Sequence, residues 1–366
     1  MKLRVLIVDD SIMFRKVITD ALSGIPEVEI VGTAANGRIA LAKVKSLKPD
    51  VLTLDLEMPE MDGLELLKVL RDEKIPVGTV LLSCLSDSCA ELTMKGLELG
   101  AFDYVPKLNG TSSEENVITI RKSLDVIFKA FKKQNLTNGL PQTKPCLLPA
   151  ALPGKPVVSP PLSPSLLPKP RDKRSEAVAI GISTGGPKAL AAVMAALPAH
   201  MGVPLFIVQH MPASFTTYLA VNLNSRCPYL VKEAENGEAV RPNTAYIAPG
   251  GKQMSVAPTT NGAGKIIRIT DDPPENNCRP SVDYLFRSIA SHYPGRATGV
   301  IMTGMGSDGA LGAKLMKQNG AVIIAQNQES CVVYGMPKAA VDAGIVDLIV
   351  PLHDIAGEIV KTLGVA

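Results

Sequence analysis

Short apolar runs alternate with longer amphipathic runs through the first third of the chain. The strand-like runs are LRVLIV, VEIVGTA, DVLTL, VGTVLL and FDYVPK, and each is followed by a segment in which apolar residues recur at helical spacing. A strand that is followed each time by a helix is typical of a parallel sheet covered by helices on both faces. The pattern therefore predicts a five-stranded, doubly wound parallel α/β domain over residues 1–125.

The same alternation resumes in the second half of the chain. Strand-like runs occur at AVAIGIS, PLFIVQH, GVIMTG, AVIIAQN and IVDLIV, with helical segments beside them. A more irregular, β-rich stretch runs from LVKEAENG to IIRIT. This half predicts a second doubly wound α/β domain with a mostly parallel sheet, over residues 176–366.

The segment between the two halves, residues 126–175, has a different character. It begins with the end of a helix and continues as TNGLPQTKPCLLPAALPGKPVVSPPLSPSLLPKPRDKRS, which has a proline every few residues and no helical or strand periodicity. Proline at this density favours extended polyproline II, so we expect a semi-rigid tether. A proline-rich docking motif for another protein is the alternative.

Composition excludes several classes of protein. The net charge of +3 over 366 residues is small, and no basic patch is interleaved with aromatics, so a nucleic-acid partner is not expected. No apolar run has the length of a membrane span, and the N-terminus turns acidic too soon for a signal peptide, so we expect a cytoplasmic protein without membrane insertion. The cysteines form no CxxC pair, which predicts free thiols in a reducing compartment. They stand at positions 84, 89, 146, 227, 278 and 331.

Polar residues follow the predicted strands of the first half. Asp9 and Asp10 follow the first strand, Asp55 the third, Ser83 the fourth and Lys107 the fifth. In an open parallel sheet, ligands bind beyond the carboxyl ends of the strands, where these side chains converge. Crowded carboxylates with a hard divalent cation among them would suit Mg²⁺. Solvated turn residues are the alternative for any one of these acids.

The stretches VDD, TLDLEMPEMDGLELL and LELGAFDYVPK resemble the receiver domain of bacterial response regulators, which has a flavodoxin-like fold. The resemblance covers about residues 1–125. It implies that Asp55 accepts a phosphoryl group from a chemotaxis histidine kinase. It also implies a Mg²⁺ site formed by Asp10, Asp55 and the backbone carbonyl of Glu57, with Asp9 as a further ligand or neighbouring carboxylate.

Two other receiver positions are implied by the same resemblance. Ser83 and Lys107 would contact the phosphoryl oxygens. Receivers commonly have proline after this lysine, whereas Leu108 follows it here, which is a departure from the receiver pattern at this loop.

In the second half, the stretch AIGISTGGPKAL places a serine on a predicted strand-to-helix turn. Gly181-x-Ser183-x-Gly185 has the form of a nucleophile elbow, in which the hydroxyl stands beside the amides that begin the next helix. A phosphate-binding turn or simple close packing would use the same glycines. Ser183 is therefore a candidate nucleophile that requires a base.

His210 is the best placed of the chain's four histidines to act as that base. It ends the strand PLFIVQH, which follows the strand that leads to Ser183, so both side chains are expected at the same edge of the sheet. A buried histidine with a purely structural role is the alternative.

The candidate acid is Asp308, in the glycine-rich turn of GVIMTGMGSDGALGAKL. The same turn has the dinucleotide-binding form Gly304-x-Gly306-x-x-Gly309. That motif expects an acid at the end of the next strand, where Gln326 and Asn327 stand instead, so a nicotinamide enzyme is the less favoured alternative. The amide of Met305 could contribute to an oxyanion hole.

The stretches GISTGGP, IVQHMP, CRPSVDYLF and MTGMGSDG resemble the catalytic domain of the chemotaxis protein-glutamate methylesterase family, over about residues 177–364. The resemblance implies Ser183 as nucleophile, His210 as general base and then acid, and Asp308 as the residue that orients it. Thr184 and Met305 would be further site residues. The implied substrates are methyl-glutamates of chemoreceptors, which yield methanol and glutamate, and receptor glutamines, which are deamidated.

The resemblance implies no cofactor for the esterase site. A phosphorylatable domain tethered to an esterase suggests that the unphosphorylated receiver covers the catalytic face. A phosphorylation-controlled binding module without catalysis remains an alternative.

Overall fold

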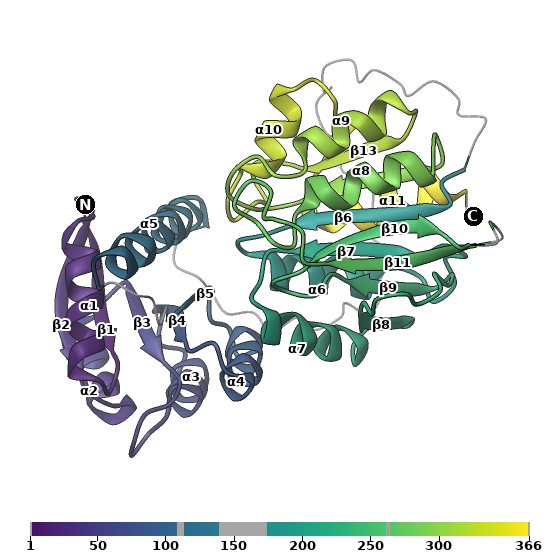
Figure 1. Ribbon diagram of the computed structural model, residues 1–366. Coiled ribbons are helices and arrows are strands. Elements are labelled where there is room, and N and C mark those ends of the chain that lie inside the picture. Colours follow the sequence, from purple (N-terminus) through teal and green to yellow (C-terminus); the bar gives the residue numbers. More distant parts are fainter. Residues whose placement is uncertain (1, 108–112, 139–173, 261, 263, 365–366) are drawn as a thin grey trace, which may run out of the picture.

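The computed structural model describes residues 2–107, 113–138, 174–260, 262 and 264–364. Leu108 and most of the predicted proline-rich tether lie outside the described residues. Two α/β domains are present, and Figure 1 shows them side by side, with the N-terminal domain in purple and blue. None of the described helices combines the length and the apolar character that a membrane span needs.

The N-terminal domain contains the predicted five-stranded parallel sheet. Its strand order is β2-β1-β3-β4-β5, and every neighbouring pair runs parallel. The strands are β1 Leu3–Val8, β2 Val28–Ala34, β3 Val51–Asp55, β4 Gly78–Ser83 and β5 Asp103–Pro106. The helices are α1 Ile12–Ser23, α2 Gly37–Leu47, α3 Gly63–Asp72, α4 Asp87–Glu98 and α5 Ser113–Asn138.

Alternation along β1 shows why both faces of this sheet are covered. Val5 and Ile7 pack with α1 and α5, whereas Leu6 and Val8 pack with α2, α3 and α4. All four side chains are completely buried, as expected for a strand whose successive side chains point to opposite faces.

The C-terminal domain has a seven-stranded sheet with the order β14-β13-β12-β6-β7-β9-β8. All of its neighbouring pairs are parallel. The strands are β6 Ala177–Ile182, β7 Leu205–Gln209, β8 Leu230–Glu233, β9 Thr244–Ile247, β12 Ala297–Ile301, β13 Val322–Gln326 and β14 Leu348–Val350. The predicted irregular β-rich stretch also forms an antiparallel hairpin, β10 Gln253–Pro258 and β11 Lys265–Thr270.

Helices cover both faces of this second sheet. On one face, Ile180 of β6 packs with helices α6, α7 and α11. On the other face, Ala179 of β6 packs with α8, α9, α10 and the hairpin. The helices are α6 Gly186–Ala196, α7 Ala213–Asn224, α8 Val282–His292, α9 Ala310–Gln318, α10 Met336–Asp342 and α11 Ile355–Leu363, the last preceded by the 3₁₀ turn Leu352–Asp354.

The two domains meet where α4 lies against α7 (Figure 1). Glu98 at the end of α4 forms a 2.5 Å ion pair with Arg226, just beyond α7, and also accepts a hydrogen bond from Asn222. Tyr104 of β5 stacks on Phe215 of α7, with ring centroids 5.1 Å apart. These contacts bring the end of the first sheet to the face of the second domain that carries Ser183.

Candidate active site

Ser183 lies directly after β6, on the tight turn that leads into α6. Its amide donates to Thr303 O at 2.9 Å, and its own carbonyl accepts from the Gly186 amide at 2.8 Å. Gly185 has a φ of 75°, and a Cβ at this residue would come 2.5 Å from the side chain of Val332. Only glycine fits such a position without strain. The predicted strand-to-helix turn is therefore present, with glycine where the backbone requires it.

His210 lies beside this turn because β7 is the neighbour of β6 in the sheet. Gln209 pairs with Ile182, and the His210 amide donates to Ile182 O at 3.1 Å. The Gln209 side chain donates from Nε2 to Ser183 O at 3.0 Å, which links the two strand ends further. The prediction that Ser183 and His210 emerge at the same edge of the sheet is confirmed.

Asp308 contacts the imidazole of His210 directly. His210 Nε2 lies 2.8 Å from Asp308 Oδ2, and the aspartate is only 3% exposed. Other donors orient the same carboxylate: Ser281 Oγ at 2.8 Å, Asn276 Nδ2 at 3.1 Å, and the amides of Val282, Asp283 and Gly309 at 2.7, 3.1 and 3.0 Å. Sequence reasoning did not identify these donors. Ser281 could be expected as the N-cap of α8, but nothing in the local pattern showed that its hydroxyl also contacts Asp308.

The histidine and the aspartate shift each other's pKa. Burial lowers the pKa of His210, but the hydrogen bond to Asp308 and the contact with Cys278 outweigh burial and raise it to about 9. Burial raises the pKa of Asp308, yet the hydrogen bond and the charge of His210, with backbone N–H donors, hold it well below its usual range. The pair therefore favours an imidazolium beside a carboxylate.

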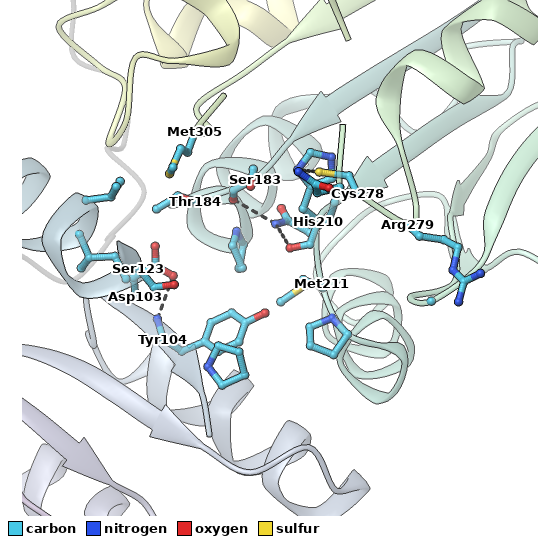
Figure 2. Close-up of a pocket in the computed structure, with 18 of the residues that line it drawn as sticks. Asp103, Tyr104, Ser123, Ser183, Thr184, His210, Met211, Cys278, Arg279 and Met305 are labelled. Atoms are coloured by element: carbon cyan, nitrogen blue, oxygen red, sulfur yellow. Dashed lines mark hydrogen bonds between the residues drawn. The ribbon is translucent and has the colours of Figure 1, made fainter. Parts of the chain in front are cut away.

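His210 lines a cavity, and its second ring nitrogen is Nδ1. His210 Nδ1 lies 3.7 Å from Cys278 Sγ, a neighbour that sequence reasoning did not assign to the site. Ser183 Oγ has no hydrogen-bond partner among the described residues, and Figure 2 shows Ser183 next to His210 at the edge of the pocket. Asp308 engages Nε2, whereas Nδ1 has Cys278 Sγ as its neighbour.

Thr184 and Met305, the further predicted site residues, line the same cavity. The Thr184 amide follows Ser183 at the start of the turn, and Met305 lies in the loop before Asp308. Neither amide donates a hydrogen bond to another group in the described parts of the chain. Both N–H groups are thus available to an oxygen atom bound near Ser183.

The cavity around these residues has a volume of about 490 Å³ and is lined by both domains. Asp103, Tyr104 and Ser123 of the first domain form the wall opposite Ser183 and His210 (Figure 2). The first domain therefore lies across one side of the candidate site.

One contact joins the first domain directly to the serine turn. Asp103 Oδ2 accepts a 3.0 Å hydrogen bond from the Gly185 amide, and its other oxygen accepts from the Tyr104 amide at 2.8 Å. Burial raises the pKa of Asp103 to about 6, although both amides oppose that rise, so this carboxyl group is ionised at neutral pH. Sequence reasoning missed Asp103 because its partner lies in the other domain.

In the first domain, four predicted residues converge at the end of the sheet. Lys107 Nζ lies 2.7 Å from Asp9 Oδ2 and 2.7 Å from Asp55 Oδ2. The carboxylate oxygens of Asp9, Asp10 and Asp55 all lie within 4.8 Å of one another. Burial raises the pKa of Asp55 to about 6, against the opposing effect of Lys107. This set of hard oxygen donors fits Mg²⁺.

The remaining predicted residues of this pocket, Ser83 and Glu57, border the β4–α4 loop. Here one expectation was wrong: Cys84 and Cys89 are not free thiols but form a disulfide, with their Cα atoms 5.7 Å apart. A separation of five residues has no characteristic disulfide spacing, but the first turn of α4 brings Cys89 back to the end of β4. Three of the other cysteines, Cys227, Cys278 and Cys331, are free.

Comparisons with known proteins support this two-domain organisation. The family model described as "Response regulator receiver domain" matches residues 5–119, and the model described as "CheB methylesterase" matches residues 178–359. A solved structure, the CheB methylesterase catalytic domain of Thermotoga maritima, superimposes with a TM-score of 0.50 at 39% identity, covering 51% of this chain and 98% of that chain. A receiver joined to such a domain defines a response regulator with an enzymatic output.

Two named relatives match nearly the whole length of the chain. The chain is 48% identical over 361 residues to a "Protein-glutamate methylesterase/protein-glutamine glutaminase" of Desulfotalea psychrophila, covering 99% of this chain and 98% of the relative. A protein of the same name from Clostridium acetobutylicum is 40% identical over 363 residues, covering 98% and 97%. The chain belongs to the CheB methylesterase family, and it is an enzyme of the carboxylic ester hydrolase class.

Proposed function

We propose that the chain hydrolyses methyl esters of glutamate side chains on chemoreceptors, and deamidates receptor glutamines, by means of Ser183, His210 and Asp308. The observation that carries the proposal is the 2.8 Å pairing of His210 with Asp308 beside the Ser183 turn. This arrangement supplies a nucleophile, a base and an orienting acid, which are the parts that serine hydrolysis requires.

In the acylation step, Ser183 Oγ attacks the ester carbonyl carbon while His210 Nδ1 accepts the hydroxyl proton. The resulting oxyanion would accept hydrogen bonds from the Thr184 and Met305 amides. Collapse of the tetrahedral intermediate expels the methoxy group, which takes the proton from His210 and leaves as methanol. A glutamine side chain would follow the same route and release ammonia.

In the deacylation step, water attacks the glutamyl ester on Ser183. His210 takes one proton from this water and returns it to Ser183 Oγ as the ester bond breaks. Asp308 remains ionised throughout and stabilises the imidazolium, because five further donors already orient its carboxylate.

The receiver is proposed to accept a phosphoryl group on Asp55 from a chemotaxis histidine kinase. Asp10, Asp55 and the Glu57 carbonyl would hold Mg²⁺, with Asp9 nearby, and the cation would neutralise charge on the transferring group. Lys107, already within 2.7 Å of Asp55, would contact a phosphoryl oxygen.

Regulation follows from the position of the receiver. Asp103 and Tyr104 of the receiver line one side of the cavity. The docked receiver is therefore proposed to restrict the access of a chemoreceptor helix to Ser183. Phosphorylation of Asp55 would weaken this docking. The domain limits of 1–125 for the receiver, 126–175 for the tether and 176–366 for the catalytic part remain predictions.

The test is a methanol-release assay on methylated receptor membranes, with Mg²⁺ and with or without a small-molecule phosphodonor. We expect the phosphodonor to stimulate the wild-type chain and to have no effect on Asp55→Asn, which should keep the basal rate. Stimulation of Asp55→Asn equal to that of the wild type would overturn the proposed regulation. Absence of methanol from every sample, under conditions in which Asp55 is phosphorylated, would overturn the proposed reaction.

A further inference from the structure

The Cys84–Cys89 disulfide lies next to the phosphoacceptor pocket of the receiver. Cys84 directly follows Ser83 at the end of β4, and Cys89 lies in the first turn of α4, where its amide donates to the N-cap oxygen of Ser86 at 3.2 Å. The bond therefore ties the start of α4 to the residue after Ser83. A Cα separation of 5.7 Å is usual for a disulfide.

The hydroxyl of Ser83 is bound to the same two cysteines. Ser83 Oγ lies 3.2 Å from the carbonyl oxygen of Cys84 and 3.4 Å from that of Cys89, and it donates to these acceptors. Thr93 Oγ1 donates to Ser83 Oγ at 2.6 Å and holds it from the other side. To contact a phosphoryl group on Asp55, the hydroxyl must leave these carbonyls, whose relative position the disulfide fixes.

Glu57 is also a neighbour of the cross-link. Its Oε2 is 3.1 Å from Cys89 Sγ and 3.8 Å from Cys84 Sγ. The carbonyl of the same residue is the proposed backbone ligand of Mg²⁺. The cross-link thus adjoins both the metal side and the hydroxyl side of the pocket.

We propose that Cys84 and Cys89 form a reversible modification site that is oxidised by a low-molecular-weight disulfide, and that the oxidised form slows phosphorylation of Asp55. Cys84 is half-buried whereas Cys89 is 4% exposed, so the thiolate of Cys84 attacks first. This step forms a mixed disulfide and releases one small thiol. Cys89 then attacks Cys84 Sγ, which forms the internal disulfide and releases the second thiol.

The effect is expected to reach the catalytic domain through α4. This helix begins at the cross-link and ends at Glu98, which pairs with Arg226 of the catalytic domain. Oxidation therefore restrains the start of a helix whose other end contacts the catalytic domain. It also restrains the two carbonyls that accept from the Ser83 hydroxyl. This inference rests on the proposed phosphorylation of Asp55.

The experiment compares the full chain in dithiol and disulfide forms. Each form is prepared with dithiothreitol or glutathione disulfide and verified by thiol alkylation and mass spectrometry. The rate of phosphoryl incorporation from a small-molecule phosphodonor with Mg²⁺ is then measured. We expect the oxidised form to react about fivefold more slowly, the lower end of typical couplings between sites, and dithiothreitol to restore the rate.

Matched variants identify the cysteines responsible. Cys84→Ser and Cys89→Ser should each be insensitive to the oxidant, and Cys227→Ser, which changes a free cysteine, should respond like the wild type. Equal rates for the two verified wild-type forms would overturn the inference, as would failure of glutathione disulfide to link Cys84 with Cys89. If the dithiol form accepts no phosphoryl group at all, the proposed phosphorylation itself fails, and the inference with it.

Discussion

At the scale of single residues, the chemistry depends on how Asp308 and Cys278 act on His210. Asp308 Oδ2 receives Nε2 at 2.8 Å, and Cys278 Sγ lies 3.7 Å from Nδ1. Both neighbours raise the pKa of the imidazole against the effect of burial. A general base acts only when it is unprotonated, so in the proposed mechanism these contacts would set the pH range in which His210 activates Ser183.

We therefore expect kcat/KM for methanol release to rise as pH increases through the pKa of His210, about 9. Cys278→Ala should move the midpoint to lower pH with a similar plateau, because one contact that raises the pKa is removed. Asp308→Asn should lower the midpoint further and also reduce the plateau by about a thousandfold or more, because the ring loses its orienting carboxylate. A profile that is flat between pH 6 and 10, or a midpoint that Cys278→Ala leaves unchanged, would contradict this assignment.

At the level of secondary-structure elements, most strands and helices could be predicted from the hydrophobic pattern of the sequence. Strand runs such as LRVLIV and AVAIGIS became β1 and β6, because completely buried parallel strands have a continuous apolar pattern. The turn after β6 was also predictable, since Gly185 and Pro187 mark the start of α6 by their backbone requirements. The strand-end rule then placed Ser183 beside His210.

Other contacts could not be predicted because they depend on tertiary structure. Besides His210, five groups donate hydrogen bonds to the Asp308 carboxylate. Some of them belong to Asn276 and to the start of α8, which are distant from Asp308 in sequence. Cys278 lies in the same loop as Asn276, and this loop places its sulfur near His210. The Cys84–Cys89 bond depends on the angle at which α4 leaves β4, which residue spacing alone does not give.

At the level of the whole molecule, the receiver is held against the catalytic domain by contacts that adjoin the Ser183 turn. Asp103 accepts a hydrogen bond from the Gly185 amide across the domain boundary, and Tyr104 stacks on Phe215. A buried amide that loses a charged acceptor costs about 1 to 3 kcal/mol. The docked arrangement is therefore sensitive to one carboxylate.

We expect Asp103→Ala to raise methanol release in the absence of phosphodonor by on the order of tenfold, because the docked state loses this hydrogen bond. Asp103→Asn retains a carbonyl acceptor for Gly185 and should change the basal rate less. Phosphoryl incorporation at Asp55 serves to verify that each variant receiver is folded. A basal rate in a folded Asp103→Ala protein equal to that of the wild type would show that this contact does not restrict the site.

Methanol release by Ser183→Ala shows whether Ser183 is the nucleophile, as proposed. A matched control is Ser291→Ala, which removes an exposed hydroxyl on α8 whose one hydrogen bond within the described part of the chain goes to the Arg287 carbonyl. We expect Ser183→Ala to release no methanol above the uncatalysed rate while its receiver still accepts a phosphoryl group. We expect Ser291→Ala to behave like the wild type. Methanol release by Ser183→Ala at a rate comparable to the wild type would contradict this role for Ser183.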